Sequence, residues 1–348
     1  MTDISAGKKV WLNEVSFMRP VLLVLLVSYH AFAPFVGTWP MPIGCEDVEL
    51  YRWLGYFSRA FLLEGFVFIS GYIFTFQLIS KNKFTDITQL AKSKFQRLLI
   101  PGILFSALYF LLFLKFSSVP HFLWRIINGV GHLWYLPCLF WCFLMQFLII
   151  SKTPKKWSIL LLLSAGIALS IIPIPLELNR ALYYIIFFSG GGAFYQYKDI
   201  IAKNTTFKRC IMMCVTFIIL FFLLNLLMEK SNLLRESSDS VLTRTLLRVI
   251  NLYLKAVLGW SGIVALYSIA VVYCRKNTLS NVIIKIGACG YGVYVFHQFI
   301  LVYLSRYTSA PQLFGTYATP WILFLVTVII SVCLTLLIRQ TSVGRKYL

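Results

Sequence analysis

Charged side chains are scarce in this chain, and acidic ones are the scarcest. Asp, Glu, Lys and Arg make up 13% of the 348 residues, and only 12 acidic residues stand against 32 Lys and Arg. An ordinary soluble domain carries about 25% charged residues. Since 59% of this chain is hydrophobic, the composition excludes a soluble domain.

The chain also lacks a cysteine framework. Its eight cysteines are scattered through apolar segments, with Cys138 and Cys142, and Cys210 and Cys214, at helical spacing. Disulfide scaffolds and zinc sites need regularly clustered ligands. The pattern indicates neither, and we expect no metal site.

Long linkers, internal repeats and a leader cleavage site are missing too. No connection is long enough to separate two domains, so we expect a single transmembrane domain over residues 1–348. No small-residue cleavage site follows the first apolar run, so we expect that run to be retained as a membrane span.

What the chain does contain is a series of long apolar runs. Because about 20 apolar residues cross a hydrocarbon layer of about 30 Å, these runs predict an all-α, polytopic membrane protein with about ten transmembrane helices. An eighth span begins after residue 245, but its start is uncertain because Arg248 and Lys255 interrupt it. The other expected spans are residues 16–36, 54–79, 98–118, 132–150, 158–175, 181–197, 210–228, 286–304 and 320–338.

Basic residues gather on one side of these spans. The N-terminus, the connections after even-numbered spans and the C-terminal tail hold 20 Lys and Arg but only four acids. The positive-inside rule then places both termini in the cytoplasm. The basic excess is a topology signal and a contact for anionic lipid, and we expect no nucleic-acid partner because no soluble basic domain exists.

The clearest candidate site lies in the first span, in the stretch RPVLLVLLVSYH from Arg19 to His30. Eleven residues are close to three helical turns, so both side chains share one helix face, about 16 Å apart. With Arg19 at the cytoplasmic surface, His30 lies near the middle of the bilayer, where an ionisable group is costly and marks a functional site. The alternative is that Arg19 anchors the span and His30 hydrogen-bonds a neighbouring helix.

Two other spans carry ionisable groups at similar depth. Glu64, on the second span, lies about 12–15 Å below the outer surface, and His297 lies in the middle of the ninth. Arg59, five residues before Glu64, offers the alternative of an ion pair that offsets the cost of burying the carboxylate.

Further candidates lie nearer the membrane surfaces. His132 begins the fourth span beside Trp134 and Tyr135, a composition equally typical of an interfacial aromatic belt. Arg97, on the cytoplasmic side like Arg19, suits a phosphate-bearing ligand because Arg binds phosphate bidentately; the alternative is ordinary anchoring. Small residues at 65, 70 and 71 allow either close helix packing or passage of a thin acyl chain.

Five segments together resemble the bacterial acyltransferase-3 membrane proteins, which O-acylate surface polysaccharides. Arg19 and His30 match the Arg-x10-His signature of that family. Ser16 departs from it, since an aspartate often stands there. The other segments that carry the resemblance are residues 64–72 (EGFVFISGY), 97–101 (RLLIP), 132–135 (HLWY) and 290–298 (GYGVYVFHQ).

The resemblance implies an O-acyltransferase of the bacterial inner membrane that moves an acetyl group from cytosolic acetyl-CoA to a hydroxyl of a glycan or lipid-linked sugar. Acetyl-CoA would be a co-substrate, with no permanently bound cofactor. His30 would be the base or the acyl carrier, and Glu64 would orient it. Arg19, Arg97, Ser70 and Gly71 would contact the acyl-CoA. The acceptor would be bound by His132, Trp134, Tyr135, His297 and Gln298.

A transporter is the alternative function, exporting an acylated sugar or a polysaccharide precursor without chemistry. Buried ionisable groups mark transport pathways equally well. Transporters built from inverted repeats show two similar halves or paired broken helices. The sequence shows neither feature.

Overall fold

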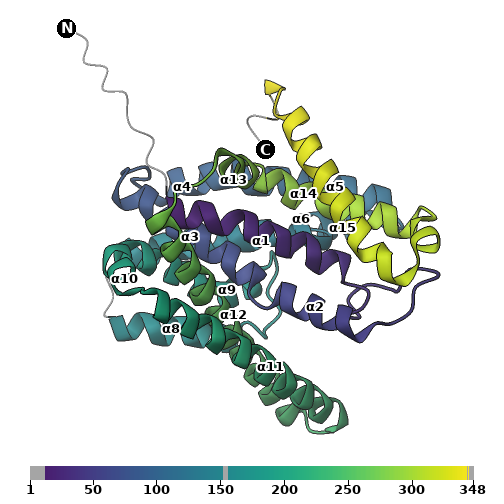
Figure 1. Ribbon diagram of the computed structural model, residues 1–348, viewed down its shortest axis with the longest axis horizontal. Coiled ribbons are helices and arrows are strands. Elements are labelled where there is room, and N and C mark those ends of the chain that lie inside the picture. The colour runs from purple at the N-terminus through teal and green to yellow at the C-terminus, as the bar shows by residue number, and fades with distance from the viewer. Residues whose placement is uncertain (1–11, 152–155, 343, 345–348) are drawn as a thin grey trace.

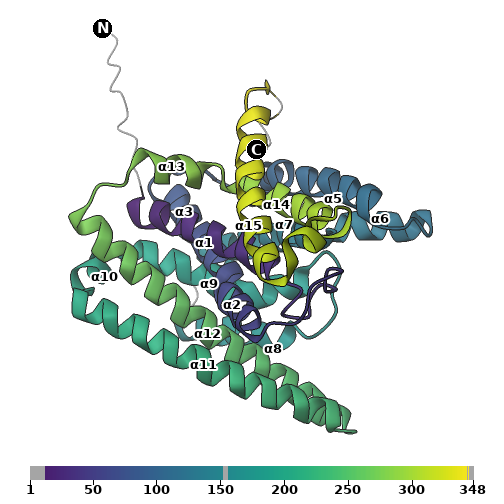
Figure 2. The ribbon, with the colours of Figure 1, turned by 45° about the vertical axis from the view of Figure 1, so that its right-hand side comes forward.

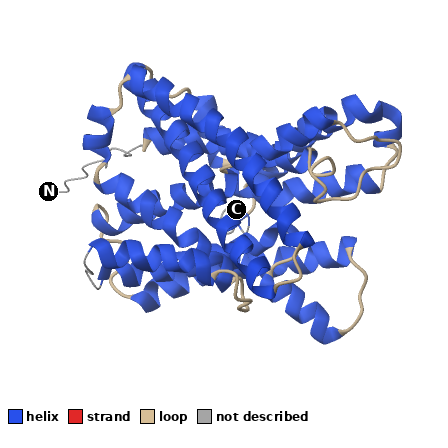
Figure 3. Cartoon of the chain, turned by 90° about the horizontal axis from the view of Figure 1, so that it is seen from below, coloured by secondary structure: helices blue, strands red, loops and turns tan. Residues whose placement is uncertain are grey.

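The computed structural model describes residues 12–151, 156–342 and 344, and every regular element in these ranges is a helix (Figure 3). The expected all-α class is confirmed. The basic residues expected at 8, 9, 152, 155, 345 and 346 lie outside the described ranges, and the cytoplasmic position of both termini stays a prediction. In chain order the helices are α1 (Asn13–Ala31), α2 (Glu49–Arg59), α3 (Leu62–Ile79), α4 (Ile87–Lys94), η1 (Phe95–Leu99), α5 (Ile100–Phe113), α6 (Val119–Asn128), η2 (Gly131–Trp134), α7 (Tyr135–Ser151), α8 (Lys156–Leu169), α9 (Leu178–Gln196), α10 (Lys198–Asn204), α11 (Phe207–Ser237), α12 (Val241–Lys276), α13 (Asn281–Ala288), α14 (Gly290–Arg306) and α15 (Ala310–Ile338).

Seven helical segments of the described chain are long and apolar enough to cross a bilayer, and α13 with α14, bent by 61°, would make an eighth. The multi-pass membrane class is therefore confirmed. Helices α8 and α9 overlap the spans expected at 158–175 and 181–197. However, α8 has only 14 residues, and α9 mixes Tyr and Gly with its apolar side chains. The number of ten spans stays a prediction.

Helix α1 lies at the centre of the fold (Figure 1). It contacts α2, α3, α12, α13, α14 and α15. Its Leu- and Val-rich sequence is helical because a segment in lipid must satisfy its own backbone hydrogen bonds. Its inner face is buried at Leu22 and Leu26. Arg19 and His30 lie on this one helix, as their spacing predicts.

Helices α3 and α9 pack with their backbones in contact. A Cβ atom added at Gly71 would lie 1.9 Å from the carbonyl oxygen of Phe188, and one added at Gly191 would lie 2.0 Å from that of Phe68. Only glycine permits this approach, which is typical of helix pairs in membranes. The packing alternative accounts for Gly71.

Helices α11 and α12 form a long hairpin that extends past the other helices (Figure 2). They have 31 and 36 residues, or about 46 and 54 Å of helix, which exceeds a hydrocarbon layer of about 30 Å. Helix α12 continues without a break through Arg248 and Lys255. These two residues therefore do not interrupt the helix, and they lie two turns apart on one face.

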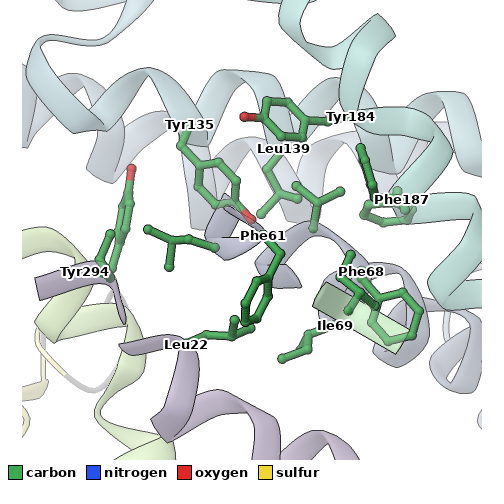
Figure 4. Close-up of a cluster of buried hydrophobic side chains, with 14 of the residues drawn as sticks. Leu22, Phe61, Phe68, Ile69, Tyr135, Leu139, Tyr184, Phe187 and Tyr294 are labelled. Carbon is green, nitrogen blue, oxygen red and sulfur yellow. The ribbon is translucent and has the colours of Figure 1, made fainter. Parts of the chain in front are cut away.

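Buried aromatic and aliphatic side chains join the central helices (Figure 4). Leu22 of α1, Phe68 of α3, Phe187 of α9 and Tyr294 of α14 belong to one core with Tyr135 of α7. The rings of Tyr135 and Tyr294 lie 5.7 Å apart. Large aromatic side chains contribute most to such cores, and this core packs together the helices that carry the polar side chains described next.

Candidate functional site

Three histidines from distant parts of the chain converge in the membrane domain. His30 lies at the end of α1, His132 in η2 and His297 in α14. The His297 ring centroid is 4.9 Å from that of His30 and 4.8 Å from that of His132. The sequence places these histidines on separate spans and does not predict that they meet. Within the described residues no group of three His, Cys, Asp or Glu is arranged to hold a metal ion.

His297 is fully buried, and its own helix fixes its tautomer. Its Nδ1 atom lies 3.0 Å from the carbonyl oxygen of Val293 and 2.7 Å from that of Tyr294. Because carbonyl oxygens only accept hydrogen bonds, Nδ1 carries the proton and Nε2 keeps the lone pair. Nε2 is buried and has no hydrogen-bond partner among the described residues.

Both ring nitrogens of His132 face oxygen atoms. Nε2 lies 3.1 Å from the carbonyl oxygen of Val295, and Nδ1 lies 2.5 Å from Oε1 of Gln298. That Oε1 atom also accepts the backbone N–H of His132, at 2.8 Å. His132 is thus tied to Gln298 and to α14, and neither nitrogen is free to accept a proton from a substrate.

His30 has an unused nitrogen and faces a cavity. Its ring stacks on Trp39, with 5.5 Å between centroids. Its Nδ1 atom is buried and finds no hydrogen-bond partner in the described part of the chain. A buried polar atom without a partner costs about 1–3 kcal/mol, and such atoms call for an explanation such as a catalytic role.

His30 lines a cavity of about 450 Å³, named here the inner cavity. This volume lies within the range of about 300–1,000 Å³ that is usual for ligand pockets. Its polar lining comes from α1, α2, α3, α11, α12, α14 and η2. The residues that supply it include His30, Arg59, Glu64, His132, Lys255 and Gln298.

Glu64 is 1% exposed and lies in the wall of the inner cavity. Its Oε1 atom is 3.7 Å from Nζ of Lys255 and accepts a hydrogen bond of 3.2 Å from the Tyr183 hydroxyl. The ion pair considered with Arg59 is therefore not formed; the partner comes from α12. No hydrogen bond joins Glu64 to His30 within the described residues, although both line the same cavity.

A second cavity of about 740 Å³, named here the outer cavity, adjoins the inner one. Arg59, Trp134 and Lys255 line both cavities. The guanidinium of Arg180 lies 4.1 Å from the Trp134 ring centroid and forms an ion pair of 2.9 Å with Glu177. Burial raises the pKa of Glu177, and Arg180 acts in the opposite direction. Trp134 therefore lines both cavities and holds Arg180 on its ring.

The other candidates occupy different surroundings. Arg19 is half-buried beside α13, and Arg97 is exposed on the π-helical turn η1; neither lines the inner or the outer cavity. The Ser70 hydroxyl donates to the carbonyl oxygen of Phe66 at 2.9 Å. Tyr135 belongs to the buried core. Roles for these residues in binding stay predictions.

Sequence reasoning missed Lys255 and Tyr183 as partners of Glu64. A signal for Lys255 was present, because an unexplained cation inside an apolar span calls for a buried acid. Tyr183 had no such signal, since tyrosine is common in these spans.

Comparison with family models matches residues 12–340 to a model described as an acyltransferase domain. The match covers nearly the whole chain. Comparison with curated proteins and with solved structures gave no significant match.

Proposed function

Because this chain belongs to the acyltransferase-3 family, we propose that it moves an acetyl group from acetyl-CoA to a sugar hydroxyl of a surface polysaccharide or its lipid-linked precursor, in the bacterial inner membrane. Family membership makes the protein a membrane acyltransferase, with an acyl donor and an acceptor. The observation that carries the finer proposal is the inner cavity, which is lined by His30, a histidine whose Nδ1 atom has no hydrogen-bond partner among the described residues.

In this proposal His30 is the general base. A hydroxyl is a weak nucleophile near neutral pH, and an imidazole can accept its proton during attack. The hydroxyl oxygen forms a bond to the thioester carbonyl carbon, and the carbon–sulfur bond then breaks. The proton held by His30 passes to the departing thiolate, so the products are an O-acetyl sugar and CoA.

His297 is the positioning residue in this scheme. Its Nδ1 proton is held by two carbonyl oxygens, which directs the lone pair to Nε2, in the ring next to His30. No hydrogen bond joins the two rings among the described residues, so His297 positions His30 by packing against its ring, with 4.9 Å between the ring centroids. Glu64 takes a different role, since its carboxylate holds Lys255 at the cavity wall.

The proposal predicts an acetylated glycan. Surface glycans from cells that express the protein should carry an acetyl mass increment, measured by mass spectrometry, which cells lacking the gene do not show. Restoring the gene should restore the increment. Identical glycan masses in the two strains would contradict an acetylated polysaccharide as the product.

Substitution of Arg19 and Arg97 tests the proposed binding of the acyl donor. Arg19→Ala and Arg97→Ala should each weaken CoA binding by about tenfold or more, since a charge-assisted hydrogen bond contributes about 1.5–3 kcal/mol. Lysine should restore binding only partly because it lacks the bidentate fork. Binding is measured by isothermal titration of purified protein with CoA.

The matched control is Lys208→Ala, which removes an exposed cation from the start of α11. It should leave CoA binding unchanged. Parent-like affinity in both arginine variants would mean that these residues are membrane anchors and do not hold phosphate.

A further inference from the structure

The outer cavity has a polar wall on the hairpin of α11 and α12, two helices that are otherwise strongly apolar. Asn225 and Asn232 of α11 line it, as do Arg248, Asn251 and Lys255 of α12. Residues three, four or seven positions apart share one helix face. Each helix thus presents a stripe of amide and charged groups to the cavity.

The opposite wall is aromatic. Tyr183 and Tyr184 of α9 line it, with Trp53 and Tyr56 of α2 and Trp134. Flat aromatic faces next to convergent amide groups are the lining expected for a sugar ring, which has apolar faces and a rim of hydroxyls.

Asn251 adds a group that calls for a ligand. Its Nδ2 donates to Oδ1 of Asn232 at 3.0 Å. Its Oδ1 atom is buried and finds no hydrogen-bond partner among the described residues. An unpaired buried acceptor is costly, and a hydroxyl donor bound in the cavity would satisfy it.

Basic side chains outnumber acidic ones in the lining of both cavities. The outer cavity is lined by five basic side chains and two acidic ones, Glu229 and Glu236 of α11. The inner cavity is lined by Arg59, Glu64 and Lys255. Glu64 pairs with Lys255, whereas Arg59 forms no ion pair within the described residues.

Arg59 lies where the two cavities meet, because it lines both. It is the last residue of α2, and its guanidinium rests 5.0 Å from the Tyr56 ring centroid. The residue is exposed and forms no ion pair among the described residues, so a ligand can reach its guanidinium. Its planar fork binds carboxylate and phosphate oxygens in a bidentate way.

We propose that the outer cavity binds the acceptor sugar and that Arg59 binds a negatively charged oxygen group on that acceptor, next to the sugar whose hydroxyl enters the inner cavity. This inference rests on the proposed acyl transfer and narrows its acceptor to an anionic one. The charge has two possible sources: a phosphate that links the sugar to lipid, or the carboxylate of an acidic sugar. Arg59 is then a specificity-determining residue.

The test measures binding of three radiolabelled probes, glucose 1-phosphate, glucuronic acid and glucose, to the full-length protein in phosphatidylcholine nanodiscs. We expect one of the anionic probes to bind at least tenfold more tightly than glucose and to weaken as salt is raised. The preferred anion identifies the source of the charge. Equal binding of all three probes, or binding of none, overturns the proposal.

Arg59→Gln should lower the affinity for the preferred anion to that for glucose, and Arg59→Lys should retain part of the preference. The matched control is Arg52→Gln, on the same helix, where Arg52 pairs with Asp47 outside both cavities. It should bind like the parent. CoA binding in the same preparations verifies folding, and an anion preference that survives Arg59→Gln overturns the role of Arg59.

Failure of the anionic-acceptor proposal can be distinguished from failure of the proposed acyl transfer. If the glycan of expressing cells gains an acetyl group while no anionic probe is preferred, acyl transfer stands and only the anionic acceptor fails. If the glycan is unchanged, the proposed function itself fails.

Discussion

Replacing His30 with glutamine should abolish acyl transfer while the protein remains folded in the membrane. Glutamine donates and accepts hydrogen bonds but cannot take up a proton at working pH. Loss of a general base typically costs about 10²–10⁴-fold in rate. The measurement is transfer of labelled acetyl from acetyl-CoA by purified protein, with CoA affinity recorded on the same samples.

His121→Gln is the matched control. His121 lies at the exposed start of α6, where Nδ1 is 2.9 Å from the Ser117 hydroxyl, and it lines neither cavity. This variant should keep full activity. Full activity in His30→Gln would refute His30 as the base, even though the family of the chain would be unaffected.

Replacing Gly191 with alanine should destabilise the protein strongly. The added Cβ atom would lie 2.0 Å from the carbonyl oxygen of Phe68 and 2.9 Å from the backbone nitrogen of Tyr72, so backbone of α3 must move. Overpacking that shifts backbone costs about 1–3 kcal/mol, occasionally more. We expect a lower thermal unfolding temperature in detergent and reduced yield of monodisperse protein.

Gly102→Ala provides the comparison, because its added Cβ would meet only side-chain atoms of Leu136, at 3.4 and 3.5 Å. Its unfolding temperature should stay close to that of the parent. Equal unfolding temperatures for the two variants would mean that α3 and α9 are not held by backbone contact.

Properties that run along one helix could be predicted from the sequence. The spacing of Arg19 and His30 and the apolar runs depend only on helical geometry and hydrophobic length. Depth in the bilayer follows from the same quantities, and it placed His30, Glu64 and His297 at a similar level. Depth is one coordinate, however, and gives no information on which helices are neighbours.

The neighbours depend on packing between segments far apart in the chain. Glu64 pairs with Lys255, 191 positions away, although Arg59 was closer in sequence. His297 meets His30 because α14 packs on α1. These contacts arise from side-chain shapes on several helices at once, which no local pattern encodes.

The contact of α3 with α9 also determines how the cavities can change shape. At Gly71 and Gly191 no side chain can rotate aside, so sliding one helix along the other would drive carbonyl oxygens into the opposite backbone. The two helices therefore behave as one rigid unit, which preserves the hydrogen bond between Glu64 and Tyr183. Widening that admits a bulky sugar is then expected at the hairpin of α11 and α12, which lines the outer cavity and whose far ends extend past the rest of the fold.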